Sequence, residues 1–154
     1  MHGYRGGSEG DEEENGVSES SLQLPLGGYL VGLGTDLVDV ERIRGVMERQ
    51  GDRFIKRVYT EQEQEYCFGM KHPHKHLAAR FAAKEAVSKA FTTGIGGRLA
   101  WTSISVYNGE RGEPHIRLDA KGEALLKEVG ASRVWISLSH TDSLAQAVAA
   151  LIRD

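Results

Sequence analysis

The chain opens its patterned part with a glycine-containing strand and a helix. Residues 29–40, YLVGLGTDLVDV, mix leucine and valine with two glycines, which predicts a strand whose backbone packs closely on a neighbour. Apolar residues then recur at helical spacing up to about residue 50: Val40, Ile43, Val46 and Met47. Asp39 is placed to cap this helix, and Gly51 ends it.

Three further helices are predicted before residue 92. A short one starts at Asp52, and the next follows a capping box formed by Thr60 and Glu63 and runs to about residue 68. Residues 69–76, GMKHPHKH, predict a loop. The segment RFAAKEAVSKAF, residues 80–91, is a helix with apolar residues around most of its circumference, and TTGIGG ends it.

The second half of the chain changes to the period of strands. Ile104 and Val106 alternate with polar residues, NGERGEP is typical of a turn, and HIRL predicts the partner strand of a hairpin. Asp119 caps a helix that Gly130 closes. VWISLSH predicts a strand and LAQAVAALI a last one, although its alanines also permit a helix. The order indicates an α+β fold, with helices mostly early and an antiparallel sheet late.

Composition indicates a globular chain of one domain. The 154 residues are 40% hydrophobic and 27% charged. A single cysteine, Cys67, excludes an internal disulfide and fits a reducing, cytoplasmic compartment. No apolar run approaches the roughly 18 residues of a membrane span, and the first residues do not have the pattern of a signal peptide.

The acidic residues are concentrated at the N-terminus. The net charge is −3, but residues 1–26 carry six acidic residues and one arginine, which leaves the remainder at +2. This segment is rich in glycine, serine and glutamate, and we expect a disordered acidic extension there, followed by one domain over residues 27–154.

Glu85 is the least expected residue of the helix over residues 80–91. One interpretation is a surface ion pair with Lys89 one turn later, worth a few tenths of a kcal/mol. However, apolar residues take most of the circumference, so Glu85 and Lys89 must border the core, where charges need partners. Lys84 fits a partner contact and a phosphate contact equally well.

Asp36 is a second candidate, since it follows the glycines of the first strand. Together with Glu85 it offers two hard oxygen ligands near cations, which suits Mg²⁺ completed by water and substrate phosphate. The alternative is that Asp36 only caps a turn or the next helix. His140 and Thr141 end a predicted strand and suggest a weaker phosphate-binding cluster, whereas the three histidines of HPHKH indicate an exposed loop rather than a zinc site.

Residues 42–57 form a basic run with a net charge of +4. A solvated helix face is the ordinary explanation, but the bias of sign suggests an acidic partner. Nucleic acid is disfavoured because no aromatic residues are interleaved and the domain as a whole is only mildly basic.

Four motifs together resemble the holo-[acyl-carrier-protein] synthases, the small bacterial type of 4′-phosphopantetheinyl transferase. They are GLGTDLVDVERI, RFAAKEAVSKAFTTGIG, NGERGEP and SLSHT, in this order over residues 30–154. The resemblance implies transfer of 4′-phosphopantetheine from coenzyme A to a serine of apo-acyl carrier protein. Adenosine 3′,5′-bisphosphate is released, and the reaction supports fatty acid biosynthesis.

The resemblance also implies roles for individual residues. Asp36 and Glu85 would bind Mg²⁺, with Lys89 beside the diphosphate as the third catalytic residue. A second set would contact coenzyme A: Arg80, Lys84, Lys89, Pro114, His140 and Thr141. The base that takes the serine proton stays open between a metal-bound water and one of the two carboxylates.

Partners follow from the same resemblance. The first helix would dock the acidic carrier protein through Arg42, Arg49 and Arg53, with apolar contacts from Val46, Met47 and Phe54. A homotrimer with active sites between subunits is expected, so that Asp36 and Glu85 would meet His140 of a neighbouring copy. Two alternatives are a carrier-binding module without activity and another coenzyme A-dependent transferase.

Overall fold

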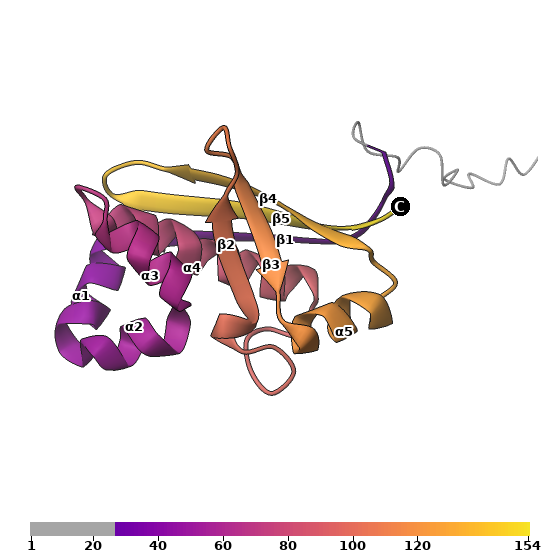
Figure 1. The fold of residues 1–154 in the computed structure, drawn as a ribbon, viewed down its shortest axis with the longest axis horizontal. Helices are drawn as coiled ribbons and strands as arrows, with labels where there is room; N and C mark the ends of the chain where they lie inside the picture. The colour runs from indigo at the N-terminus through magenta and orange to yellow at the C-terminus, as the bar shows by residue number, and fades with distance from the viewer. Residues whose placement is uncertain (1–26) are drawn as a thin grey trace, which may run out of the picture.

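The computed structural model describes residues 27–154, which form two antiparallel sheets and five α-helices (Figure 1). The elements are β1 (Tyr29–Asp39), α1 (Val40–Gln50), α2 (Asp52–Val58), α3 (Glu61–Phe68), α4 (Pro73–Ala90), the 3₁₀ helix η2 (Trp101–Ser103), β2 (Ile104–Asn108), β3 (Pro114–Leu118), α5 (Ala120–Glu128), β4 (Arg133–His140) and β5 (Leu144–Arg153). The predicted α+β class is confirmed. The predicted disordered extension, residues 1–26, lies outside the described part of the chain.

The main sheet has the strand order β1-β5-β4, with α4 on one face and α1 to α3 gathered at one end (Figure 1). In its register Asp36 of β1 pairs with Ala147 of β5, and His140 of β4 pairs with Ala145 of β5. The last segment is therefore a strand and not a helix. The predicted hairpin is the separate sheet β2-β3, closed by the pairing of Asn108 with Pro114.

Two glycines allow α4 to lie unusually close to β1. A Cβ atom on Gly32 would overlap the carbonyl oxygen of Ala90, and one on Gly34 would overlap that of Ala86. Because side chains alternate along a strand, Gly32, Gly34 and Asp36 share the face that meets α4. The predicted close packing of this strand is confirmed, and it places Asp36 beside the last turns of the helix.

Most of α4 is buried, as its apolar circumference predicts. The helix begins earlier than expected, at Pro73, because proline at the first helical position needs no N–H partner and has the correct φ. His74 and His76 are therefore helical residues, and the predicted loop over residues 69–76 is correct only for its first half.

The predicted caps are partly confirmed. Thr60 and Glu63 form the capping box of α3, and Asp119 accepts a hydrogen bond from the backbone N–H of Gly122 in α5. The predicted side-chain cap by Asp39 is wrong. β1 continues to this residue, and the N–H of Val40 donates instead to the carbonyl oxygen of Ser143, 2.9 Å away.

The face of the main sheet opposite α4 is apolar and open to solvent. Leu33 and Trp135 both pair with Ala150, one from each side of β5, and are 57% and 51% exposed. Leu37, on the same face of β1 as Leu33, is 61% exposed. Val148 of β5 also lies on this face, because it pairs with Thr35, between Leu33 and Leu37. No helix in the described residues has the length and the apolarity needed to cross a membrane.

Candidate functional site

Asp36, Glu85 and Lys89 lie together where β1 meets α4. Glu85 and Lys89 are one helical turn apart, and the Lys89 ammonium donates to Asp36 Oδ1 at 3.0 Å and to the Thr35 carbonyl oxygen at 3.1 Å. The Asp36 side chain is only 16% exposed, whereas that of Lys89 is 52% exposed. The expected grouping of these three residues is therefore present within one chain.

The surroundings of Glu85 disfavour its charge. Partial burial raises the pKa of the Glu85 carboxyl above its usual range, and the nearby Asp36 carboxylate raises it further, while Lys89 and Arg42 act in the opposite direction. Two carboxylates held close together in this way attract a cation. Glu85 also lines a surface cavity of about 540 Å³ with Arg57, Ile95, Gly96, Ala100 and Trp101.

Arg80 lies at a second cavity, of about 270 Å³, with Pro114 and His140. Arg80 is only 4% exposed, its Nη2 donates to Asn108 Oδ1 at 2.7 Å, and its guanidinium lies 4.3 Å from the centre of the Tyr66 ring. Its Nε is buried and has no hydrogen-bond partner among the described residues. Because Arg80 lines the cavity, its guanidinium is a candidate contact for an anion there.

The two groups lie on opposite flanks of α4. Arg80 and Glu85 are five residues apart, which places them about 140° apart around the helix. Asp36 and His140 are separated by two strand spacings and two residues of rise, or about 12 Å between Cα atoms. One chain therefore brings together the metal-binding candidates and, separately, the phosphate-binding candidates.

Lys84 is not a phosphate contact, which corrects the expectation. Its side chain is fully buried, and its ammonium donates to Glu63 Oε1 at 2.6 Å, to the Val58 carbonyl oxygen at 2.6 Å and to that of Trp101 at 3.1 Å. All three of its donors are used inside the protein. Burial lowers the pKa of Lys84, and the Glu63 carboxylate raises it.

Phe54 is not an exposed apolar contact either. It is 7% exposed and packs on Tyr59 and Phe81 in the core, because α2 turns this face towards α4. Arg42, Arg49 and Arg53 are all exposed, on α1 and α2, as expected for a docking surface. Val46 and Met47 are partly buried against the core.

Thr141 has a local structural role in the turn between β4 and β5. Its Oγ1 accepts hydrogen bonds from the backbone N–H groups of Ser143 and Leu144, at 3.3 and 3.0 Å. Thr141 follows His140 directly, so it lies at the rim of the Arg80 cavity without being one of its lining residues.

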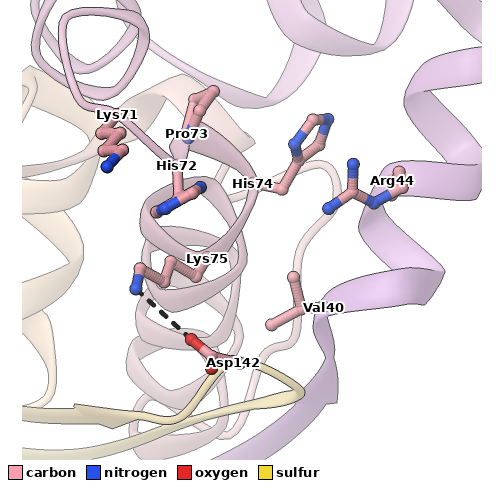
Figure 2. Close-up of a pocket in the computed structure, with 8 residues that line it drawn as sticks. All are labelled: Val40, Arg44, Lys71, His72, Pro73, His74, Lys75 and Asp142. Carbon is pink, nitrogen blue, oxygen red and sulfur yellow. Dashed lines mark ion pairs between the residues drawn. The ribbon is translucent and has the colours of Figure 1, made fainter.

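A basic cavity of about 470 Å³ lies between α1, the start of α4 and the β4–β5 turn (Figure 2). It is lined by three cations, Arg44, Lys71 and Lys75, and by the histidines His72 and His74, and Asp142 lies 3.5 Å from the Lys75 ammonium. The described residues contain no group of three or more histidine, cysteine, aspartate or glutamate side chains that could hold a metal ion.

Sequence patterns did not indicate four residues around Arg80 and Lys84. Glu63 was identified only as a capping residue, yet it also accepts from Lys84 and from the Val106 N–H. Tyr66, His76 and Asn108 line the Arg80 cavity from α3, α4 and β2. Tyr66 and Asn108 lie 14 and 28 positions from Arg80, and Glu63 lies 21 positions from Lys84, so periodicity within one element carries no signal for these three. His76 lies four positions before Arg80 on α4, but the sequence predicted a loop there.

Comparison with known proteins gives a consistent result. The family model described as the 4′-phosphopantetheinyl transferase superfamily matches residues 32–150. Holo-[acyl-carrier-protein] synthase of Chlamydia trachomatis serovar L2 is 45% identical over 120 residues, which are 78% of this chain and 98% of that protein.

Two solved structures extend the comparison. The holo-[acyl-carrier-protein] synthase of Neisseria meningitidis superposes with a TM-score of 0.76 at 32% identity, covering 80% of this chain and 99% of that one. The enzyme from Bacillus anthracis, solved in complex with coenzyme A (3′,5′-ADP), gives a TM-score of 0.68 at 33% identity, covering 81% and 98%.

Proposed function

The chain belongs to the 4′-phosphopantetheinyl transferase superfamily, and on this basis we propose that it is a holo-[acyl-carrier-protein] synthase. It transfers 4′-phosphopantetheine from coenzyme A to a serine hydroxyl of apo-acyl carrier protein and releases adenosine 3′,5′-bisphosphate. The observation that carries this proposal is that one chain contains two groups. Asp36, Glu85 and Lys89 lie together, and Arg80, whose Nε has no hydrogen-bond partner among the described residues, lines a separate cavity.

The carboxylates of Asp36 and Glu85 are proposed as ligands of Mg²⁺. Their donor set fits this ion, because Mg²⁺ takes one or two protein carboxylates and keeps water and substrate phosphate as its other ligands. When bound there, Mg²⁺ would supply positive charge that offsets the charge developing on the leaving phosphate. Burial, and then the neighbouring Asp36 carboxylate, raise the pKa of Glu85, and a cation held by both carboxylates would favour their charged forms.

Lys89 and Arg80 act on the phosphates of coenzyme A. The Lys89 ammonium has three donors, two of which hold Asp36 and Thr35, and its half-exposed position lets the third reach the diphosphate. Arg80 Nε, with His140 beside it, binds the phosphate on the ribose, while Pro114 borders the nucleotide. Phosphoryl transfer needs positioning and charge neutralisation of this kind.

A mass measurement tests the activity. The protein, apo-acyl carrier protein, coenzyme A and Mg²⁺ are mixed, and the carrier should gain the mass of phosphopantetheine. A carrier-binding module would bind the carrier without changing its mass, and an acyltransferase would add only an acyl group. Either result, with folded protein, contradicts the proposal.

The carrier protein is proposed to dock on α1 and α2 through Arg42, Arg49 and Arg53. All three arginines are exposed and belong to the basic run, residues 42–57. Acyl carrier proteins are acidic, so the charges are complementary. Reversing the charge at Arg42 and Arg53 should raise the KM for the carrier by about ten-fold and flatten its salt dependence, with little change in the KM for coenzyme A. An unchanged KM for the carrier places the docking surface elsewhere.

The assembled enzyme is proposed to be a homotrimer that works in fatty acid biosynthesis in the cytoplasm. The open apolar face of the main sheet supports self-association, because monomers rarely expose contiguous apolar surface of this kind. The Asp36–Glu85–Lys89 group and the Arg80 cavity lie on opposite flanks of α4. This separation supports active sites that are completed by a neighbouring copy.

A further inference from the structure

His76 is a residue of the Arg80 cavity to which neither the sequence motifs nor the proposed reaction assigns a task. It lies one helical turn before Arg80 on α4 and lines the same cavity. Its ring makes edge contacts with two other rings there, at 5.4 Å to the centre of the His140 ring and 6.1 Å to that of Tyr66. His76 is thus placed between an aromatic wall and a candidate phosphate-binding histidine.

Most side chains around His76 are either cations or bases that become cations when they are protonated. Arg80 and Lys75 share its helix, His72 precedes that helix, and His140 faces it from β4, while Tyr66 faces it from α3 with a neutral phenol. Lys75 is paired with Asp142 on the far side, in the basic cavity of Figure 2. The Arg80 cavity itself therefore offers His76 no carboxylate among its lining residues.

Burial and these neighbours disfavour protonation of the free His76 ring. Burial lowers the pKa of the His76 imidazole from its ordinary value, and His140, Arg80, Lys75 and His72 lower it further. A phosphate ester in the cavity reverses the balance, since its negative charge favours the protonated imidazole. The protonated ring then has two N–H donors for phosphate oxygens.

We infer that His76 is a third cationic contact for a phosphate ester bound beside Arg80 and His140, and that it takes up a proton from solvent when this ester binds. The inference rests on the proposed function, because it takes the ribose phosphate of coenzyme A as the ester. It adds a pH dependence to nucleotide binding. Affinity rises as the pH falls through the range in which His76 is neutral in the free protein and protonated in the complex.

Calorimetry with adenosine 3′,5′-bisphosphate tests this inference without the transfer reaction. Titrations in buffers of different ionisation enthalpy, near neutral pH, count the protons taken up on binding. His76→Phe keeps an aromatic ring without a titrating group, and His74→Phe makes the same change two residues away, outside this cavity. Because the phosphate also titrates near pH 6, the comparison between variants isolates the histidine.

The wild type and His74→Phe should take up more protons than His76→Phe. As the pH falls from about 8 to about 6, the affinity of the wild type should rise several-fold relative to that of His76→Phe. A pKa change of one unit sets an upper limit of about ten-fold, which is reached only below both pKa values. In the wild type, the His76 ring signal followed by NMR should titrate at higher pH in the complex than in the free protein. This measurement needs no variant.

Equal proton uptake in all three proteins, or a His76 titration that the nucleotide does not move, overturns the inference. Failure of the nucleotide to bind overturns it together with the assignment of the cavity. The mass gain of the carrier protein decides the proposed function independently, since a transferase active on its carrier can lack any proton linkage at His76.

Discussion

At Glu85, the proposed metal ligand, burial and the neighbouring Asp36 carboxylate make the ionised form of the carboxyl group unfavourable in the free protein. Its pKa is raised in the folded state, so the folded protein binds this proton more tightly than the unfolded chain. The stabilisation is fully present below the ordinary pKa of glutamate and is lost as the pH rises through the raised folded value. At neutral pH the ionised side chain therefore opposes folding until a cation pairs with it.

We predict that Glu85→Gln lowers the rate of transfer at least about 100-fold. The same variant should have a higher Tm than the wild type at neutral pH in the absence of Mg²⁺. Adding Mg²⁺ should raise the Tm of the wild type and not that of the variant. Thermal unfolding with and without Mg²⁺, beside the mass assay, measures both effects. A variant that keeps its activity would show that Glu85 is not a metal ligand.

Lys84 provides a prediction of the opposite kind, in which stability falls. Lys84→Met leaves the buried Glu63 carboxylate without its cation and should cost about 3–5 kcal/mol of unfolding free energy. Glu63→Gln combined with Lys84→Met should cost less than the single change, because no charge stays buried. Urea unfolding of the three proteins measures this, and a stable Lys84→Met with weakened coenzyme A binding would restore the phosphate role.

Comparison of Lys84 with Arg80 shows how far residue-level prediction could reach. Both are cations on the same buried helix, and the pattern of α4 does not distinguish them. What separates them is tertiary: Lys84 meets a carboxylate and two carbonyl oxygens, whereas Arg80 keeps one donor without a partner. Asp36, Glu85 and Lys89 could be grouped beforehand because motifs identified them, and their geometry agrees.

Elements were predicted best where local chemistry decides their ends. The capping box of α3 and the cap of α5 depend on residues three apart, and both formed as predicted. The cap by Asp39 did not form: its side chain makes no capping hydrogen bond, and β1, paired with β5, continues through this residue. Tertiary contacts of this kind are invisible to a local pattern.

The approach of α4 to β1 is the element-scale feature on which the metal-binding group depends. At Gly34 a Cβ atom would overlap the Ala86 carbonyl oxygen and lie 2.7 Å from the Ala90 nitrogen, so Gly34→Ala must push helix and strand apart. We predict a loss of about 1–3 kcal/mol in unfolding free energy and reduced transfer, as the Lys89–Asp36 contact lengthens.

Denaturant unfolding and the mass assay check the Gly34 prediction against a matched control. Gly97→Ala adds the same methyl group where nothing lies within 4 Å of it, and should change stability by less than about 0.5 kcal/mol. If both substitutions are equally mild, the helix and strand have room that their close contact does not suggest.

In the whole molecule, the candidate site residues lie on two flanks of α4, and this arrangement limits how they can form one active site. The Asp36–Glu85–Lys89 group and the Arg80 cavity lie on opposite flanks of α4, so a coenzyme A molecule bound to both within one chain would have to extend across the helix. A neighbouring copy avoids this, and the open apolar sheet face around Leu33 and Trp135 gives copies a reason to associate.

We predict that two inactive variants restore activity when they are mixed. Glu85→Gln lacks a metal ligand and His140→Ala lacks part of the Arg80 cavity. If each site combines Glu85 of one copy with His140 of the next, equal amounts exchanged at random into a closed ring give intact groups at about a quarter of the sites. Transfer should recover to about that fraction of the wild-type rate.

The apolar sheet face supplies the control for this mixing experiment. With Leu33→Lys added to both variants, association through the sheet should fail and mixing should restore nothing, while Ala124→Lys on the exposed side of α5 should leave recovery intact. Light scattering on the same samples reports whether the copies separate. No recovery in stable oligomers would mean that each chain carries a complete active site, and coenzyme A would then have to reach across α4. Recovery that persists after Leu33→Lys would mean that the copies associate through a surface other than the sheet face.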